Sequence, residues 1–539
     1  MWSSRRLVYT HGDLPKLWPD LRSGQRNPAW KITTRPLVIG RSTWFWIGCI
    51  AISSGVLLHL PMLAEAHAMG NRLTGMPVDG PMLTGMACIA LGVPLACWGA
   101  LPSANRAQIG VSVPKFEAPD ATPMNGWHLG VIAVLILGLV IDVMKPATLG
   151  FVLPGLAKEY GISRSTAALL PLVALTGTFA GSLIWGWLAD HYGRRVSILL
   201  SAILFASTSI CGAMPTFLWN LVMCFLMGCS AGGMLPVVYT LLAEIMPPRH
   251  RSWVLVLVGG TGLVGGYLAA SGAAHLLEPS YGWRALWLQG FPTGLLLLAL
   301  ARLIPESPVF LFAQGRTKEL SILAKRFDIA QIAPSEQRLD PTTNTIAGRL
   351  GAVLTLTALS WSFVNFGLLL WLPMDLQARG YSPGLASGIL ASSSLLALPT
   401  IALAAWSYSQ VSSKWTLIAT ILLTLGGLLG ALMPISLLTW QPVLITVISV
   451  LIVGTNGTIA ILLPYTAESY PFAVRGRATG LVAGSSKFGG ISAQVAAFAG
   501  FNPTLGGAAL VLLAPTALSA IAMYWIGRET AGRSLGEIA

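Results

Sequence analysis

The chain has 539 residues, of which 54% are hydrophobic and only 10% are charged. Soluble domains carry about 25% charged residues, so this composition excludes an ordinary soluble protein and indicates one that crosses a membrane repeatedly. The net charge is +13, from 33 Lys and Arg against 20 Asp and Glu, and its meaning depends on where the basic residues lie.

About fourteen apolar stretches follow one another, most of them close to the roughly 20 residues that a membrane helix needs. Because backbone amides in lipid have no water to bond, these stretches are predicted to be helices. They lie near 43–65, 81–102, 127–156, 164–189, 196–213, 219–246, 252–276, 284–301, 350–373, 383–405, 414–433, 441–466, 479–501 and 506–527.

The basic residues are distributed unevenly between the two sides of the predicted membrane. Residues 1–42 hold eight Lys and Arg and residues 302–349 hold seven, whereas short loops of the opposite parity hold few. This distribution predicts that both termini and the 302–349 segment are cytoplasmic. It also accounts for the positive charge without nucleic acid as a partner. The six cysteines lie inside apolar stretches and match no zinc or disulfide spacing.

Four sequence elements resemble those of the major facilitator superfamily. The first, Gly186-Trp187-Leu188-Ala189-Asp190-His191-Tyr192-Gly193-Arg194-Arg195, is similar to the signature loop between the second and third family helices. The second, Pro305-Glu306-Ser307-Pro308, resembles the element after the sixth helix of sugar-porter-like and organic-ion-porter-like members. The pattern Ala-Glu-x-x-Pro-x-x-x-Arg occurs twice, from Ala243 and from Ala467, as a duplicated gene would leave it.

The resemblance implies an all-α membrane protein of two six-helix bundles, in a sugar-porter-like or organic acid (metabolite):proton symporter-like branch. An added N-terminal hairpin gives about fourteen helices in all. The expected parts are a basic cytoplasmic tail (1–42), the hairpin (43–102), a cytoplasmic linker (103–126), the N-terminal bundle (127–301), a cytoplasmic inter-bundle loop (302–349), the C-terminal bundle (350–527) and a cytoplasmic tail (528–539).

The resemblance also implies a cytoplasmic gate of ion pairs that form in one state and break in the other. Its predicted residues are Asp190, Arg194, Arg195, Glu244 and Arg251 in the first half, with Glu468, Arg475 and Arg477 in the second. The alternative is that they only hold helix ends at the lipid headgroups. The second copy of the signature loop, residues 406–414, has neither an Asp nor an Arg pair, which predicts a weaker network there.

Ionisable residues deep in a membrane are costly and mark functional sites. Asp142, in the first family helix, is the predicted proton carrier, because related members carry an Asp there. Lys145 lies three residues on, so we expect both on one face as a coupled pair. In one alternative this is a static ion pair. In another, Lys145 binds the carboxylate of the solute and Asp142 releases it on protonation.

Three further side chains are candidates for contact with a solute. Lys487, in the eleventh family helix, either attracts an anion into the cavity or joins the Glu468 cluster. Asn365 and Asn456 lie in family helices that line the cavity, and a buried amide needs hydrogen-bond partners that a solute could supply.

The sequence therefore predicts a secondary transporter of a small organic solute, favouring an organic acid or similar metabolite, driven by protons. No GxxxxGK[ST] loop is present for ATP, and we expect no cofactor, metal or catalytic constellation. The alternatives are a sugar porter, a drug exporter, or a non-transporting sensor of the same fold. We expect a monomer in the lipid bilayer of a bacterial inner membrane.

Overall fold

Nearly every described element is a helix, as apolar stretches in lipid require. The structure, a computed structural model, describes residues 41–74, 76–101, 115–117, 122–332, 343–470 and 472–531. Most of the predicted tail 1–42 and linker 103–126 lies outside them. Within the described part, twelve helices are long and apolar enough to cross a membrane. The count of fourteen spans stays a prediction.

The first described helices precede those that the family resemblance covers. The predicted stretch at 43–65 is two helices, because the chain turns at Leu58 and His59 between them. They are α1 (Arg41–Leu57) and α2 (Leu60–Ala68), followed by α3 (Gly80–Ala100). Helices α1 and α3 pack tightly through glycines: a Cβ added at Gly48 would lie 2.3 Å from the backbone nitrogen of Ala96.

We call the next group of helices the first half. It consists of α4 (Gly126–Tyr160), α5 (Arg164–Ala167), α6 (Leu169–Tyr192), α7 (Arg194–Ser207), η2 (Thr208–Ala213), α8 (Phe217–Ala231), α9 (Met234–Ile245), α10 (Pro248–Tyr281), α11 (Ala285–Leu288) and α12 (Gly290–Leu300). Asn125 caps α4 by accepting from the backbone nitrogens of Trp127 and His128.

A short segment separates this group from the second half. It holds α13 (Pro308–Ala313), α14 (Thr317–Phe327) and β2 (Ala330–Ile332), and β2 pairs antiparallel with β1 (Lys115–Glu117). The second half consists of α15 (Thr343–Gly367), η3 (Leu369–Trp371), α16 (Leu372–Ala378), α17 (Pro383–Gln410), α18 (Ser413–Ala431), α19 (Ile435–Leu438), α20 (Gln441–Ser469), α21 (Phe472–Phe498) and α22 (Leu505–Ile526).

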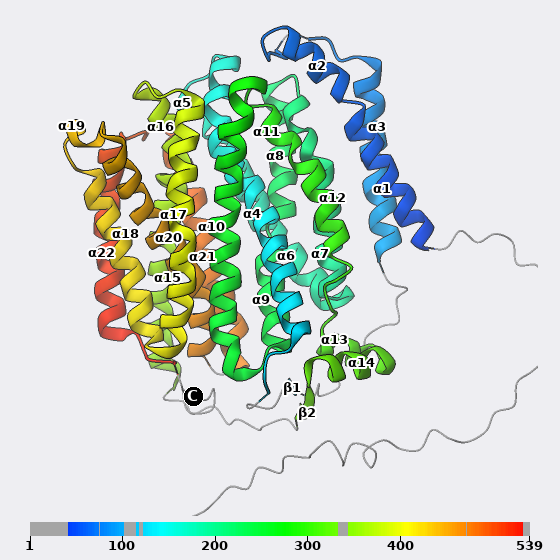
Figure 1. Ribbon diagram of the computed structural model, residues 1–539, viewed down its shortest axis with the longest axis vertical. Coiled ribbons are helices and arrows are strands. Elements are labelled where there is room, and N and C mark those ends of the chain that lie inside the picture. The colour runs from blue at the N-terminus through cyan, green and yellow to red at the C-terminus, as the bar shows by residue number, and fades with distance from the viewer. Residues whose placement is uncertain are drawn as a thin grey trace, which may run out of the picture. The chain divides into compact units, whose positions relative to one another are not determined.

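The long helices run alongside one another, with α10 and α17 close to the middle of the view (Figure 1). The two halves meet where α10 packs against α17 and α20, and where α6 packs against α21. Small residues allow this approach: a Cβ added at Gly260 of α10 would lie 2.6 Å from the Ile401 side chain. The predicted bundle boundaries, 127–301 and 350–527, stay predictions.

The packing of α6 against α8 gives a test of this arrangement. A Cβ added at Gly228 would lie 2.0 Å from the carbonyl oxygen of Ala174 in the neighbouring helix. We therefore expect Gly228→Ala to lower the free energy of unfolding by about 1–3 kcal/mol, because the helices must separate to admit a methyl group.

The matched control is Gly130→Ala in α4, where an added Cβ meets nothing within 4 Å. Thermal unfolding of the purified protein in detergent measures both. Equal melting temperatures for the two variants would show that α6 and α8 do not pack as described.

Candidate functional site

Asp142 lies in the middle of α4 and is 3% exposed. Its Oδ1 atom has no hydrogen-bond partner within the described part of the chain. Lys487, on α21 of the second half, is the charged group that acts on Asp142 electrostatically, and Asp142 acts on Lys487 in return. These two ionisable side chains thus come from different halves, and no ion pair joins them among the described contacts.

The structure corrects the expected pair of Asp142 and Lys145. The Lys145 ammonium donates to the Phe205 carbonyl and to Thr208 Oγ1, and lies 4.4 Å from the Phe205 ring centroid. Its side chain is also close to Gly290 of α12, so it lies among helices of the first half. The Lys side chain has four flexible CH₂ groups, so its ammonium can reach carbonyl and hydroxyl oxygens that do not lie on the helix face of Asp142.

Polar groups on helices of both halves lack partners within the part of the chain that the structure describes. They are Trp361 Nε1 on α15, Thr455 Oγ1 on α20, Gln494 Oε1 on α21, and the hydroxyls of Tyr239 and Tyr267 on α9 and α10. Most buried polar groups in native proteins are bonded, so these five atoms are candidates for hydrogen bonds that another conformation or a bound molecule supplies. The two tyrosines were missed from the sequence. The available signal was a Tyr within an apolar stretch.

The two predicted asparagines differ in exposure. Asn456 is 8% exposed and lies one helical turn from Ala460, whose side chain approaches Gly260 of α10. Its amide is therefore on the face of α20 that turns to the first half. Asn365 is partly exposed on α15, one turn from Trp361. The structure does not show these amides bonded to each other.

We call the end of the helices that carries Asp190 and Glu244 the inner end. There, Arg194 at the start of α7 lies 3.2 Å from Glu244 and 3.7 Å from Asp190. Glu306 accepts from the backbone nitrogen of Arg194 at 2.7 Å, which caps α7. Burial raises the pKa of the Glu306 carboxyl, and the nitrogens of Ser307 and Arg194 act against that rise. Three of the predicted gate residues therefore meet.

The other predicted gate residues lie elsewhere. The Arg195 guanidinium donates to the carbonyls of Ala301 and Arg302, so it holds the end of α12, whereas the backbone nitrogen of Arg195 interacts with Glu306. Arg251 lies 3.5 Å from the Met246 carbonyl and also acts on Glu468 electrostatically. The side chains of Arg475 and Arg477 lie outside the described residues.

Glu468 joins the halves at the inner end. It accepts from Ser252 Oγ of α10 at 2.5 Å, from Tyr408 Oη at 2.6 Å and from Thr530 Oγ1 at 3.0 Å. Lys487 is not among the groups that bond Glu468 in the described part of the chain, and its electrostatic interaction is with Asp142. A contact between Lys487 and an anion in the cavity stays a prediction. Glu468 thus links a first-half hydroxyl to the tyrosine of the altered 406–414 loop.

Glu529 performs in the second half the role that Glu306 performs in the first. It accepts from Ser412 Oγ, from Ser413 Oγ at 2.7 Å and from the Ser413 backbone nitrogen at 2.8 Å, which caps α18. Burial would raise the pKa of the Glu529 carboxyl, but these hydrogen bonds hold it below its usual value. In the 406–414 loop, the Ser412 and Ser413 hydroxyls therefore bind a carboxylate where the first-half loop has an Asp and an Arg pair.

The halves also meet at the opposite, outer end. Arg164 of α5 lies 2.6 Å from Asp375 of α16, and its guanidinium lies over the Trp371 ring at 4.8 Å. Asn502 donates to Ser165 Oγ at 2.7 Å nearby. Polar contacts therefore join the halves at both ends, with Asp142 and Lys487 between them. No group of three metal-ligating side chains occurs among the described residues.

Comparison with known proteins gives a consistent family. The sequence profile of the Major Facilitator Superfamily matches residues 135–494. A niacin transporter, NiaP of Acinetobacter baylyi, is 26% identical over 443 residues, which are 77% of this chain and 97% of that protein. The 4-hydroxybenzoate transporter PcaK of the same species is 29% identical over 278 residues, 48% of this chain and 59% of its own.

Solved structures give the same fold. The xylose transporter XylE of E. coli, in a partially occluded inward-open conformation, aligns with a TM-score of 0.60. The alignment covers 76% of this chain and all of that one, at 17% identity. This likeness therefore concerns the fold alone.

The cap of α18 predicts a pH-dependent contribution to stability. A carboxyl with a lowered pKa stabilises the folded state above its ordinary pKa of about 4.3, and this contribution is lost as pH falls through the folded-state value. We therefore expect Glu529→Gln to lower the melting temperature at pH 7, with a difference from the unsubstituted protein that shrinks below about pH 4.

The control is Glu319→Gln, which removes an exposed pair with Arg316 and should change the melting temperature little. Thermal unfolding in detergent at pH 7 and below about pH 4 gives the melting temperatures of both variants and of the unsubstituted protein. A Glu529→Gln difference that grows towards low pH would contradict the cap.

Proposed function

This chain belongs to the Major Facilitator Superfamily, and we propose that it carries a small organic acid across the membrane together with protons, by alternating access. As a member of this family, it is a multi-pass membrane transporter and not an enzyme. Relatives named for niacin and 4-hydroxybenzoate support a solute of that chemistry, an aromatic ring carrying a carboxylate. We also propose a monomer in a bacterial inner membrane, with cytoplasmic termini.

The observation that carries this proposal is the placement of Asp142 and Lys487 on opposite halves, with Asp142 Oδ1 unbonded in the described structure. The ammonium of Lys487 can pair with one carboxylate fully. A solute carboxylate that binds Lys487 competes with Asp142, and two ionised carboxylates at one cation repel each other. The solute therefore binds more readily when Asp142 takes up a proton, and this couples solute binding to proton binding.

Alternating access requires the contacts at the two ends to break in turn. The Ser252–Glu468 hydrogen bond joins the halves at the inner end, and the Arg164–Asp375 ion pair joins them at the outer end. Each is partly buried, so it is strong when formed and easily replaced by water once the helices part. In this proposal the Arg194–Glu244 pair steadies the inner end of the first half.

The aromatic acid is favoured over a sugar by the interior charges. A sugar carries no charge, and it would leave the Lys487 ammonium without a new partner. The unbonded Trp361 Nε1 and the Tyr239 and Tyr267 hydroxyls suit a ring that carries polar substituents. The likeness to the xylose transporter, at 17% identity, does not bear on the solute.

Replacement of Asp142 tests the coupling. We expect Asp142→Asn to abolish accumulation of labelled nicotinate and 4-hydroxybenzoate driven by a pH gradient in proteoliposomes, because an amide cannot carry the proton. Exchange of labelled for unlabelled solute should persist, since exchange needs no net proton movement.

Asp328→Asn is the control, because Asp328 is exposed after α14 in a left-handed conformation that Asn also adopts. It should accumulate solute as the unsubstituted protein does. Normal accumulation by Asp142→Asn would exclude Asp142 as the carrier. If the unsubstituted protein transports neither nicotinate nor 4-hydroxybenzoate, another class of solute or a non-transporting sensor of the same fold is favoured.

Replacement of Lys487 tests solute binding separately. We expect Lys487→Gln to raise KM for 4-hydroxybenzoate about 10- to 100-fold, which corresponds to losing a hydrogen bond to a charged group worth about 1.5–3 kcal/mol. Lys487→Arg should recover part of the affinity. Lys318→Gln, on exposed α14, is the control. An unchanged KM in Lys487→Gln would place the carboxylate elsewhere.

A further inference from the structure

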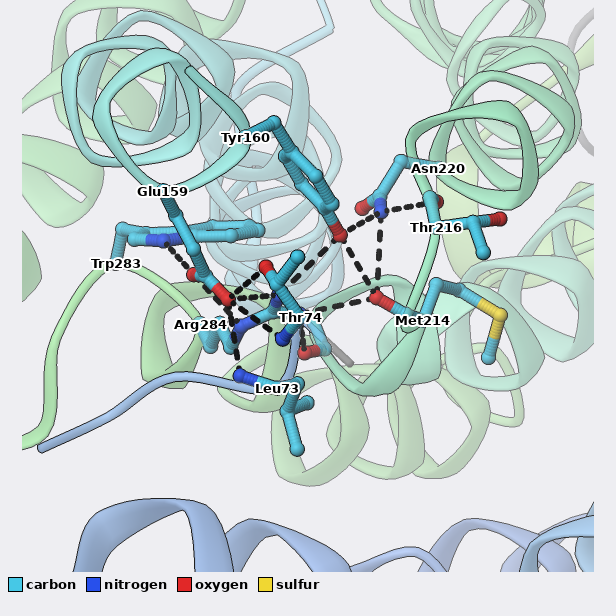
Figure 2. Close-up of polar contacts among 10 residues, drawn as sticks. Leu73, Thr74, Glu159, Tyr160, Met214, Thr216, Asn220, Trp283 and Arg284 are labelled. Atoms are coloured by element: carbon cyan, nitrogen blue, oxygen red, sulfur yellow. Dashed lines mark hydrogen bonds and ion pairs between the residues drawn. The ribbon is translucent and has the colours of Figure 1, made fainter. Parts of the chain in front are cut away.

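The loop between α2 and α3 docks on a buried ion pair of the first half. Glu159, at the end of α4, accepts from the backbone nitrogens of Leu73 and Thr74 at 2.9 and 3.2 Å, and from Thr74 Oγ1 at 2.9 Å. Figure 2 shows these three bonds converging on one carboxylate oxygen. Leu73 is fully buried beside it.

The carboxylate itself is held rigidly. Arg284 donates to both oxygens of Glu159, at 2.7 and 3.1 Å, and Trp283 Nε1 donates at 2.9 Å. Arg284 also donates to the Gly212 carbonyl and, as Figure 2 shows, to the Met214 carbonyl. The Glu159 and Arg284 side chains are only 5% and 3% exposed. The loop therefore binds a preformed site built from α4, η2 and the segment before α11.

A second contact lies at the other end of α1. The guanidinium of Arg302, which follows α12, lies 4.7 Å from the centroid of the Trp46 ring. From Trp46 to the end of α1 at Leu57 the helix rises about 17 Å, and α2 follows before the loop at Leu73, so the two contacts lie far apart along the hairpin. The hairpin's partners at these two contacts, Glu159 and Arg302, lie on or directly after helices of the first half.

Apolar packing fills the distance between the two contacts. Ile52 of α1 and Ala96 of α3 share a buried cluster with Leu200 and Ile203 of α7, and α3 packs along α7. Figure 1 shows α1 and α3 at one edge of the helices and α18 and α22 at the opposite edge. Contacts at three heights leave no hinge about which the hairpin could turn against α7.

We propose that helices α1–α3 move as a fixed part of the first half when the two halves rock, with Glu159 as the residue that positions their outer loop. The movement rests on the proposed alternating access, whereas the attachment does not. The hairpin then enlarges one of the two moving bodies, because its main helix contacts are with α7 of the first half.

Distances between spin labels test this proposal without any solute. After replacement of the six native cysteines, labels are placed in pairs on cysteines at three exposed outer-end positions: Met69 on the hairpin, Leu276 on the first half and Ile435 on the second. Pulsed electron resonance then gives the distance distributions at pH 5 and pH 8, with and without Asp142→Asn to bias the conformation.

We expect the Met69–Leu276 distribution to be narrow and unchanged, while Met69–Ile435 shifts together with Leu276–Ile435. A Met69–Leu276 distribution that is broad, or that shifts with the others, overturns the proposal. A static Leu276–Ile435 distance beside a narrow Met69–Leu276 distribution counts against alternating access and still supports the attachment.

The role of Glu159 has its own variants. Glu159→Gln should broaden the Met69–Leu276 distribution, whereas Glu65→Gln, which changes an exposed carboxylate on α2, should not. Should Glu159→Gln fail to fold, Thr74→Val removes one donor while leaving the Glu159–Arg284 pair in place. No broadening in any folded variant excludes Glu159 as the positioning residue.

Discussion

A charged side chain inside lipid needs a polar partner. In this chain, several charged residues in the interior and at the helix ends have partners on helices that are far apart in sequence. Arg164 pairs with Asp375, Glu468 accepts from Ser252, and Asp142 interacts electrostatically with Lys487 of the opposite half. The Arg164–Asp375 and Ser252–Glu468 contacts join the halves, and in the proposed alternating access they are also the places where the halves part. Stability of one conformation and capacity for another therefore reside in the same groups.

Buried charges within one half have a different character. Lys145 is surrounded by a carbonyl, a hydroxyl and an aromatic ring, and Arg284 forms a two-pronged contact with Glu159. None of these described partners lies in the second half, so the rocking that we propose would leave them buried. We infer that such groups fix the shape of the moving bodies, whereas the charges that face the other half take part in movement.

Helices and family could be predicted from the sequence because both depend on local patterns: apolar length, the signature loop and the repeated Ala-Glu pattern. The electrostatic interaction between Asp142 and Lys487 could not be predicted. Helix spacing pointed to Lys145, but a long side chain reaches in several directions, and Lys487 is 345 positions away in the chain. Tyr239 and Tyr267 were missed because a Tyr within an apolar stretch does not reveal whether its hydroxyl has a hydrogen-bond partner.

The cap that Glu529 places on α18 has a consequence for the history of the chain. The 406–414 loop lacks the charges of its first-half counterpart, and Ser412 and Ser413 instead bind an acid that follows the last helix. The 406–414 loop and the segment around Glu529 therefore depend on each other structurally. A substitution in either should be tolerated only with a matching change in the other, so these distant positions are expected to covary among descendants of the same gene.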